Sequence, residues 1–468
     1  MLSTASYYLP RRAALALVVT ALSVSACGGG GDGNEEPLGP GGAVATVSVA
    51  VPSANLVVGD VLPAEALAKD ATGKTVQATF TWTSSDTDVA TVNPQGQAIG
   101  VTAGTAIITA TASGKSGTVT LTVAPQNLNT MVEAVRAQRG LPAMSGAIVT
   151  RQGLVAIGVA GTRQAGGAGG TVTLNDKWHI GSNLKAITAA LAAVAVTEGA
   201  ISWTTTVEDA FPEHAATMNA QYKSVKLEDL LANRAGIRND PPAAAYTGAT
   251  ARQQRESLVA WAVGANPMNP VGTYFYSNPS FVIAGAMVER ALGGDYEALV
   301  QSKLGQPLGV SSLGWGPVPA GNPVAHYRSG ANWIPCSAAN CDNPPGLSAA
   351  GRAHMSMGDW SKIVRELLRA DTGESTLISA ANGRKLFTGI TPIGGPDSYS
   401  LGWIMTTRPW AGGDGRTATH SGSNTLNHSI AWLGMSEGVA FLAATNASDA
   451  GTPAALDDLI LGMLNSHF

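Results

Sequence analysis

The sequence has little charge, little cysteine and no long apolar run beyond its first residues. Charged residues make up 13% of the 468, with 28 Lys and Arg against 32 Asp and Glu. Because no block of Lys or Arg occurs, nothing indicates a nucleic-acid partner. The longest later apolar run, residues 186–196, is too short to cross a bilayer. Hydrophobic residues reach 45%, enough for a buried core in a chain long enough for two domains.

Cysteine occurs three times in the chain. Cys336 and Cys341 lie close together in a Pro-containing loop, and in an oxidising compartment such a pair can form a small disulfide. We expect no metal there, because no neighbouring Cys or His supplies further ligands. No motif implies an organic cofactor.

The N-terminal segment 1–27 has the features of an export signal. Arg11 and Arg12 give a basic start, and the apolar stretch 13–26 suits a signal but is too short to span a bilayer. Small residues followed by Cys27 resemble the lipobox of bacterial lipoproteins, in which the Cys is acylated and becomes the mature N-terminus. The alternative is an ordinary signal with a Cys there by chance. The Gly-rich segment that follows favours the tethered lipoprotein.

Residues 44–124 follow a flexible Gly- and Pro-containing linker, 28–43, and are typical of a small β-sandwich. Residues 44–49 alternate as a half-buried strand does, and further β-rich runs are separated by turn residues: 79–83, 89–92, 104–110 and 118–123. Their order and spacing resemble bacterial Ig-like domains of group 2. In that interpretation Trp82 fills the sandwich core and carries no chemistry.

Residues 128–468 mix helix and strand. We expect helices at 131–139 and 182–198, a hairpin over 145–161, a mostly helical middle to about 370, strands at 400–407, 429–433 and 439–445, and a last helix at 453–464. Strands at both ends around a helical insert predict an α+β layer with an all-α region.

The first candidate catalytic pair is Ser182 with Lys185. Residues three apart on a helix share a face, so Lys185 is expected to lie over Ser182. The residues after Lys185 are apolar, and desolvation lowers a Lys pKa so that the amine can act as a base. The positive end of the helix favours an oxyanion beside Ser182. The alternative role for Ser182 is an ordinary N-cap.

Two later motifs supply further candidates. Tyr276 near a cation could ionise and accept a hydroxyl proton, and Asn278 offers a donor and an acceptor to a substrate amide. Gly422 permits close backbone approach, and the Ser423 amide could be a second oxyanion donor. Each motif alone also fits a structural role: an aromatic loop packed on the core, and His420 as a surface or core histidine.

In this order, the motifs 182–185, 276–278 and 420–423 resemble the serine β-lactamase and penicillin-binding-protein superfamily, and best its class C β-lactamase-like branch, which includes esterases and D-amino-acid peptidases. Further patches agree: 230–237, 306–309, 355–360 and 401–403. The resemblance implies a multidomain protein. A small all-β Ig-like sandwich would precede an α+β β-lactamase-like domain, with an antiparallel sheet flanked by helices plus a helical region.

The resemblance also implies acyl transfer with Ser182 as nucleophile and the Ser182 and Ser423 amides around the oxyanion. The formal base, Lys185 or Tyr276, stays open. Asn278, His420, Gly422 and Ser423 would bind a small ester, amide or peptidoglycan-like substrate. The family more often has His or Thr where this chain has Asn233-Arg234, a departure to which we assign no chemistry.

His420 is a second departure, because true β-lactamases usually carry Lys there. A histidine has an ordinary pKa near 6.5, so much of it is uncharged at neutral pH. Any preference for a substrate carboxylate should weaken as pH rises through the pKa of His420, whatever its local shift. Arg416 could replace the missing charge. We therefore expect an exported serine hydrolase of the esterase or D-amino-acid peptidase type. The alternatives are a class C-like β-lactamase, or an inactive cell-wall-binding lipoprotein whose Ig-like domain contacts the cell surface.

The export signal leads to a first prediction. The mature chain should begin at a lipid-modified Cys27 on the periplasmic side of a bacterial membrane, and Gly28 after it resembles lipoproteins sent on to the outer membrane. Mass spectrometry of the mature N-terminus measures this directly. An unlipidated chain retaining Cys27 in membrane-free fractions would contradict it.

Overall fold

The computed structural model describes residues 42–336 and 341–468. Residues 1–27, with the lipobox Cys27, lie outside this part of the chain. Two compact units are present: the first contains the chain up to Ala124 together with Asn465–Phe468, and the second is Pro125–Leu464. No helix in the described ranges combines the length and apolar character of a membrane span.

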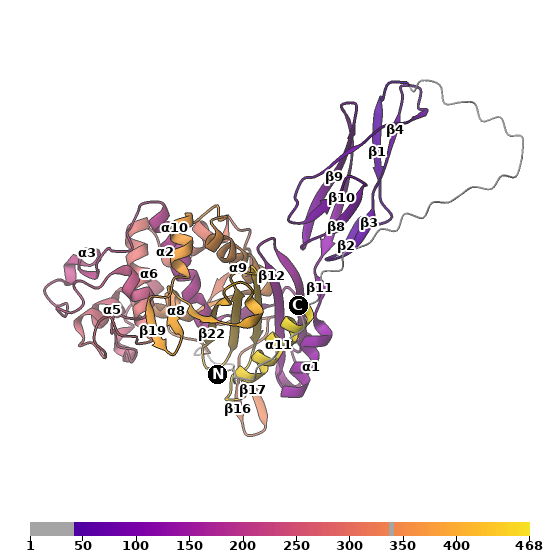
Figure 1. The fold of residues 1–468 in the computed structure, drawn as a ribbon. Coiled ribbons are helices and arrows are strands. Elements are labelled where there is room, and N and C mark those ends of the chain that lie inside the picture. The colour runs from indigo at the N-terminus through magenta and orange to yellow at the C-terminus, as the bar shows by residue number, and fades with distance from the viewer. Residues whose placement is uncertain (1–41, 337–340) are drawn as a thin grey trace, which may run out of the picture. The chain divides into compact units, whose positions relative to one another are not determined.

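The first unit is built of short strands (Figure 1). Its sheets have the orders β1-β4-β5, β2-β10-β9-β6 and β3-β8-β7. The strands are β1 (Thr46–Ala50), β2 (Asn55–Val57), β3 (Val61–Pro63), β4 (Glu65–Lys69), β5 (Thr75–Val76), β6 (Thr81–Ser84), β7 (Ala90–Val92), β8 (Gln97–Gly100), β9 (Gly104–Ala112) and β10 (Lys115–Ala124). The five runs expected from alternation each fall on a strand, within a few residues at the ends. The Ig-like assignment itself stays a prediction.

The core of this unit comes from the alternating faces of β9 and β10. Ile108 and Leu121 are fully buried, and Val123 is nearly so. Trp82 is only half-buried, with its ring close to Gly96. The expectation that Trp82 fills the core is therefore wrong: aliphatic residues of the longest strand pair do so, because that pair buries a whole face.

The second unit centres on a nine-stranded sheet of order β11-β13-β12-β24-β23-β22-β21-β20-β19. Its strands are β11 (Gln126–Asn127), β12 (Ala143–Thr150), β13 (Leu154–Gly161), β19 (Thr391–Gly394), β20 (Asp397–Tyr399), β21 (Ile404–Thr407), β22 (Arg416–Ser423), β23 (His428–Gly434) and β24 (Val439–Thr445). The edge pair β11 and β13 is parallel and the other neighbours are antiparallel. The sheet is therefore mixed, where a purely antiparallel one was expected.

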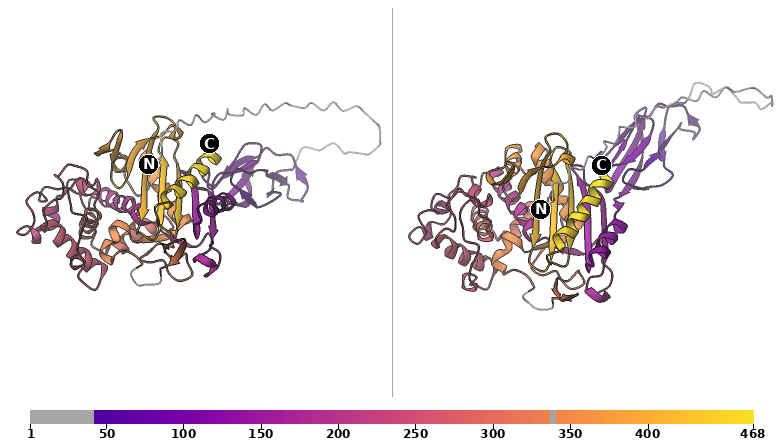
Figure 2. Two further views of the ribbon diagram at one scale, coloured as in Figure 1. Left: turned by 90° about the horizontal axis from the view of Figure 1, so that it is seen from below. Right: turned by 60° about the horizontal axis from the view of Figure 1, so that its bottom comes forward.

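Helices cover both faces of this sheet (Figure 2). Side chains alternate across a strand. On β12, Gly146 faces Leu459 and Met463 of α11 (Thr452–His467). Ala147 joins the opposite core, which includes α2 (Leu184–Thr197) and α9 (Met357–Thr372). Helix α1 (Asn129–Arg139) packs on β13.

The middle of the chain forms the expected helical region, at the end of the unit away from α1 and α11 (Figure 1). It contains α3 (Val207–Ala210), α4 (Leu227–Leu231), α5 (Ala251–Gly264), α6 (Asn278–Leu292), α7 (Tyr296–Val300), α8 (Ser348–Gly351) and α10 (Ala380–Leu386). Short strands connect it to the rest: β14 (Lys177–His179), β15 (Gly314–Trp315) and β18 (Ala353–Ser356) form one small sheet, and β16 (His326–Ser329) and β17 (Asn332–Pro335) form a hairpin.

The expected hairpin, the last helix and two of the three C-terminal strands are confirmed by β12–β13, α11, β23 and β24. The third overlaps β21, which begins only at Ile404. Strand β22 was not expected, because its sequence is mostly small and polar and has no large apolar residue to mark a strand. It is central in the sheet, and its end reaches the candidate site.

Candidate active site

Ser182 lies in a short turn, Gly181–Asn183, between β14 and α2. It caps no backbone amide of α2, so the N-cap alternative does not hold. Gly181 has a φ of 50°, and a Cβ there would lie 2.4 Å from the Ser423 amide nitrogen. A Cβ on Gly422 would lie 2.9 Å from the Ser182 amide nitrogen. Two glycines thus allow the end of β22 to bring both candidate oxyanion amides to the same place.

Lys185 is fully buried on the first turn of α2. Its Nζ lies 3.0 Å from Ser182 Oγ, 2.7 Å from Asn278 Oδ1 and 2.8 Å from Ala350 O. Burial lowers the pKa of Lys185 well below 10.5. A neutral amine has two hydrogens and one lone pair. The amide and carbonyl oxygens can only accept, so they take the hydrogens and the lone pair faces the Ser182 hydroxyl.

Tyr276 is hydrogen-bonded to Ser182, and its ring centre lies 4.9 Å from Lys185 Nζ. Burial raises the pKa of this phenol, an effect that outweighs the hydrogen bond to Ser182. The expectation that Tyr276 could ionise below its ordinary pKa is therefore wrong. Tyr276 stays a phenol that can donate a proton, while the lone pair belongs to Lys185.

Asn278 begins α6, where Ser277 caps the helix by accepting from the Ser280 amide. The Oδ1 of Asn278 accepts from Lys185, which leaves its Nδ2 as a donor for a substrate. The structure thus brings Ser182, Lys185, Tyr276 and Asn278 together.

Asn233 holds the loop that carries Tyr276. It is buried with a φ of 51°, a left-handed conformation that Asn adopts more readily than most residues. Its carbonyl accepts from the Phe275 amide at 2.7 Å, and its Oδ1 accepts from the Ser277 amide at 3.0 Å. The backbone and the side chain of Asn233 therefore fix the two residues on either side of Tyr276. Sequence reasoning assigned Asn233 no role, although an Asn before Arg-Ala-Gly was an available signal for a turn.

His420 lies at the back of the site and is buried. Its Nδ1 is 2.7 Å from the Ser421 carbonyl, to which it donates, and its Nε2 is 3.1 Å from the Tyr399 hydroxyl, from which it accepts. Burial, and in second place Lys185 when it is protonated, lowers the pKa of His420 to about 3. The local shift therefore moves the expected weakening of a carboxylate preference far below neutral pH, where the ring is already neutral.

Arg416 does not supply the missing cation. Its guanidinium is held at the start of β22 by both carboxylate oxygens of Asp371, at 3.0 and 2.6 Å. Cys336 and Cys341 are joined by a disulfide. Within the described residues, no group of three or more His, Cys, Asp or Glu side chains could hold a metal ion.

A nucleophile turn, a buried lysine and a tyrosine on a neighbouring loop define the arrangement of a serine hydrolase site. The beta-lactamase family model matches residues 128–462, and the chain belongs to this family, within the β-lactamase- and penicillin-binding-protein-like serine hydrolases.

Solved structures share the fold. The D-amino acid amidase from Ochrobactrum anthropi SV3 is 18% identical over 73% of this chain and 99% of its own, with a TM-score of 0.59. A D-stereospecific amidohydrolase from Streptomyces is 21% identical over 70% of this chain and 96% of its own, with a TM-score of 0.56. The penicillin-binding protein homologue from Pyrococcus abyssi is 21% identical over 70% of this chain and 75% of its own, with a TM-score of 0.58.

A curated relative, the unguisins hydrolase of Aspergillus violaceofuscus, is 25% identical over 268 residues. The match covers 50% of this chain and 46% of that protein, so this chain spans about half the length of the relative it matches.

The state of His420 leads to a second prediction. Because its lowered pKa keeps the ring uncharged above about pH 3, its charge does not change between about pH 5 and 8. The ratio of kcat/KM for a substrate with a free carboxylate to that for its neutral amide should therefore stay constant over this range. Protonation of Lys185 affects both substrates equally and cancels. A ratio that falls severalfold around pH 6.5 would show that His420 titrates there.

Proposed function

We propose that the chain is an exported serine hydrolase that cleaves an amide or ester through an acyl-enzyme formed on Ser182. The observation that carries this is the buried Lys185 amine, 3.0 Å from Ser182 Oγ, with its two hydrogens engaged elsewhere. An amine held in this way accepts the hydroxyl proton as the oxygen attacks.

The proposed reaction uses groups of four residues, Ser182, Lys185, Tyr276 and Ser423. Ser182 Oγ bonds to the substrate carbonyl carbon while its proton passes to Lys185 Nζ. The carbonyl oxygen becomes an oxyanion facing the amides of Ser182 and Ser423. As the bond to the leaving group breaks, that group takes a proton from Lys185, or from the Tyr276 hydroxyl, which Lys185 then reprotonates. Water then attacks the acyl-enzyme, releases the acid and restores the Ser182 hydroxyl.

The substrate class we propose is an amide or ester without an obligatory carboxylate next to the scissile bond, D-amino-acid amides among them. The neutral His420 and the paired Arg416 offer no cation for such a carboxylate. The D-amino acid amidase and D-stereospecific amidohydrolase with this fold support an amide. A true β-lactamase remains the second candidate because the family includes that activity.

Export remains part of this proposal and rests on the N-terminal sequence. A disulfide in the hydrolase unit suits an oxidising compartment such as the periplasm. An inactive binding lipoprotein is the weaker alternative, because a buried lysine directed at a serine costs stability that binding alone does not require.

A third prediction concerns the nucleophile. Ser182→Ala should abolish turnover and covalent labelling by a fluorophosphonate. Lys185→Ala should lower kcat by a similar factor, at least about 10³, because the two groups act as a unit. Tyr276→Phe should cost about 10².

The matched controls are Lys223→Ala and Tyr327→Phe, because Lys223 is paired with Glu208 and Tyr327 is exposed. Both should keep wild-type kcat. Normal labelling of Ser182→Ala would place the nucleophile elsewhere.

A fourth prediction concerns substrate choice. The kcat/KM for a short-chain p-nitrophenyl ester or a D-amino-acid amide should exceed that for a chromogenic cephalosporin at about pH 7.5, because neither His420 nor Arg416 offers a free cation to the cephalosporin carboxylate. Parallel assays with Ser182→Ala subtract spontaneous hydrolysis. A cephalosporin preferred by more than about a hundredfold, about 2.7 kcal/mol in the transition state, would make the chain a β-lactamase.

A further inference from the structure

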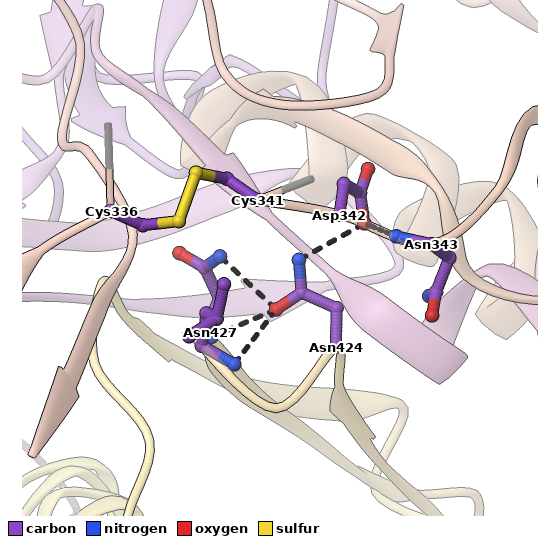
Figure 3. The surroundings of a disulfide bond; sticks show 7 residues. Cys336, Cys341, Asp342, Asn343, Asn424 and Asn427 are labelled. Carbon is purple, nitrogen blue, oxygen red and sulfur yellow. Dashed lines mark hydrogen bonds between the residues drawn. A yellow bond between two sulfur atoms is a disulfide. The ribbon is translucent and has the colours of Figure 1, made fainter. Parts of the chain in front are cut away.

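Asp342 directly follows the disulfide and is almost sealed from solvent, with 1% of its side chain exposed (Figure 3). Its Oδ1 accepts from the Asn424 side chain at 3.0 Å and from the Asn343 amide at 2.8 Å. The same oxygen lies 3.0 Å from His179 Nε2. A single carboxylate oxygen thus contacts two segments that are far apart in the sequence.

The contact with His179 leads to the nucleophile turn. His179 ends β14, and its Nδ1 accepts from the Gly181 amide at 3.1 Å. That bond places the ring proton on Nε2, the nitrogen beside Asp342. Asp342 is therefore in close polar contact, without a hydrogen bond, with the ring that holds Gly181, the residue directly before Ser182.

The contact with Asn424 leads to the other candidate oxyanion amide. Asn424 directly follows Ser423, and its Oδ1 accepts from the amides of Leu426 and Asn427 and from the Asn427 side chain (Figure 3). The turn after β22 is thus built around Asn424. By holding Asn424, Asp342 fixes the end of the strand that carries the Ser423 amide.

The neighbouring Asn343 reaches the third part of the site. Its Nδ2 donates to the Gly351 carbonyl at 2.9 Å. Gly351 follows Ala350, whose carbonyl accepts from Lys185. Asp342 and Asn343, the two residues after Cys341, therefore contact residues that hold Ser182, Ser423 and Lys185 in place.

A buried carboxylate acts in this way only while it is held in place. Burial opposes its charge, but the contacts with His179, Asn424 and the Asn343 amide outweigh burial and lower the pKa of Asp342. Arg352 Nε lies 3.7 Å from its second oxygen. Separating a buried charge from its partners costs free energy, so we expect His179 and Asn424 to follow small shifts of Asp342. The disulfide between Cys336 and Cys341 restrains Cys341, the residue directly before Asp342.

The disulfide is not enclosed by the core. Cys336 is half-buried, and a small pocket borders both cysteines, lined in addition by Val324 and Asn427. A small dithiol can therefore approach the bond. Its reduction is a complete exchange: the dithiol gives two electrons and two protons, becomes a disulfide, and leaves two thiols at Cys336 and Cys341.

We propose that Asp342 is a positioning residue for both oxyanion amides, and that the Cys336–Cys341 disulfide makes its placement depend on redox state. This inference rests on the proposed function. In the oxidised chain the amides of Ser182 and Ser423 are aligned. In the reduced chain Asp342 shifts, the amides lose alignment, and acylation slows while substrate binding is retained.

The test is a double-mutant cycle in the full chain carrying Cys27→Ser, so that the pair is the only source of thiols. With a p-nitrophenyl ester, Asp342→Ala should lower kcat by about 10- to 100-fold, comparable to the loss of an oxyanion donor, with KM within about twofold. Reduction of the parent by a dithiol, or Cys336→Ser with Cys341→Ser, should lower kcat about tenfold. In the Asp342→Ala background the same cysteine changes should cost less than about twofold, because both act through one residue.

Asp371→Ala is the matched control, since it also removes a buried carboxylate from an arginine partner but lies away from this loop. It should lower Tm and leave kcat unchanged. Asp342→Asn keeps an acceptor for Asn424 and His179 and should recover part of the lost kcat. Reduction of the unmutated pair needs no substitution, so a variant that fails to fold does not block the test.

Additive effects of the cysteine and Asp342 changes, or an Asp342→Ala variant with parental kcat, would overturn the inference. Those results leave Ser182→Ala inactive and the proposed function intact. Activity retained by Ser182→Ala would instead refute the proposed function itself.

Discussion

The desolvated amine of Lys185 is the interaction on which the rest of the site depends. Burial disfavours its charge, and two oxygens that can only accept, from Asn278 and Ala350, fix its hydrogens and so its lone pair. The geometry requires α6, α8 and α2 to meet around one nitrogen. The helical region and the Ala-rich packing of α2 are therefore part of the chemistry, because they exclude the water that would restore the charge.

A second constraint is backbone approach. The turn before α2 and the end of β22 come so close that Gly181 and Gly422 leave no room for a Cβ. Around this contact the supports form a continuous polar network: Asn233 holds the Tyr276 loop, Tyr399 holds His420, and Asp342 holds His179 and Asn424. These contacts join protein groups to one another in the interior, so this part of the network is in place before a substrate arrives.

Much of the site could be predicted because its parts are local. Ser182 and Lys185 are three residues apart at the start of an apolar helix, so spacing alone places them on one face. Tyr276 and Asn278 belong to one short motif at the start of another helix. What failed concerned environment. The lowered pKa expected for Tyr276 near a cation left burial out of account. Burial raises the pKa of Tyr276 and lowers that of His420. Strand β22 was missed because its neighbours in the sheet, and not its own residues, make it a strand.

The sequence by itself determined the order of the elements, the candidate nucleophile pair and the cysteine pair, since helix period, strand alternation and short spacings are properties of the chain. Only the tertiary structure decided which protonation states these residues hold and which distant residues support them. The Ala350 carbonyl carries no side-chain signal, and Asp342 lies 163 residues after His179 in the chain yet 3.0 Å away in space. Burial and long-range contact arise only when the chain is folded, and they set the charge and orientation of every group in the site.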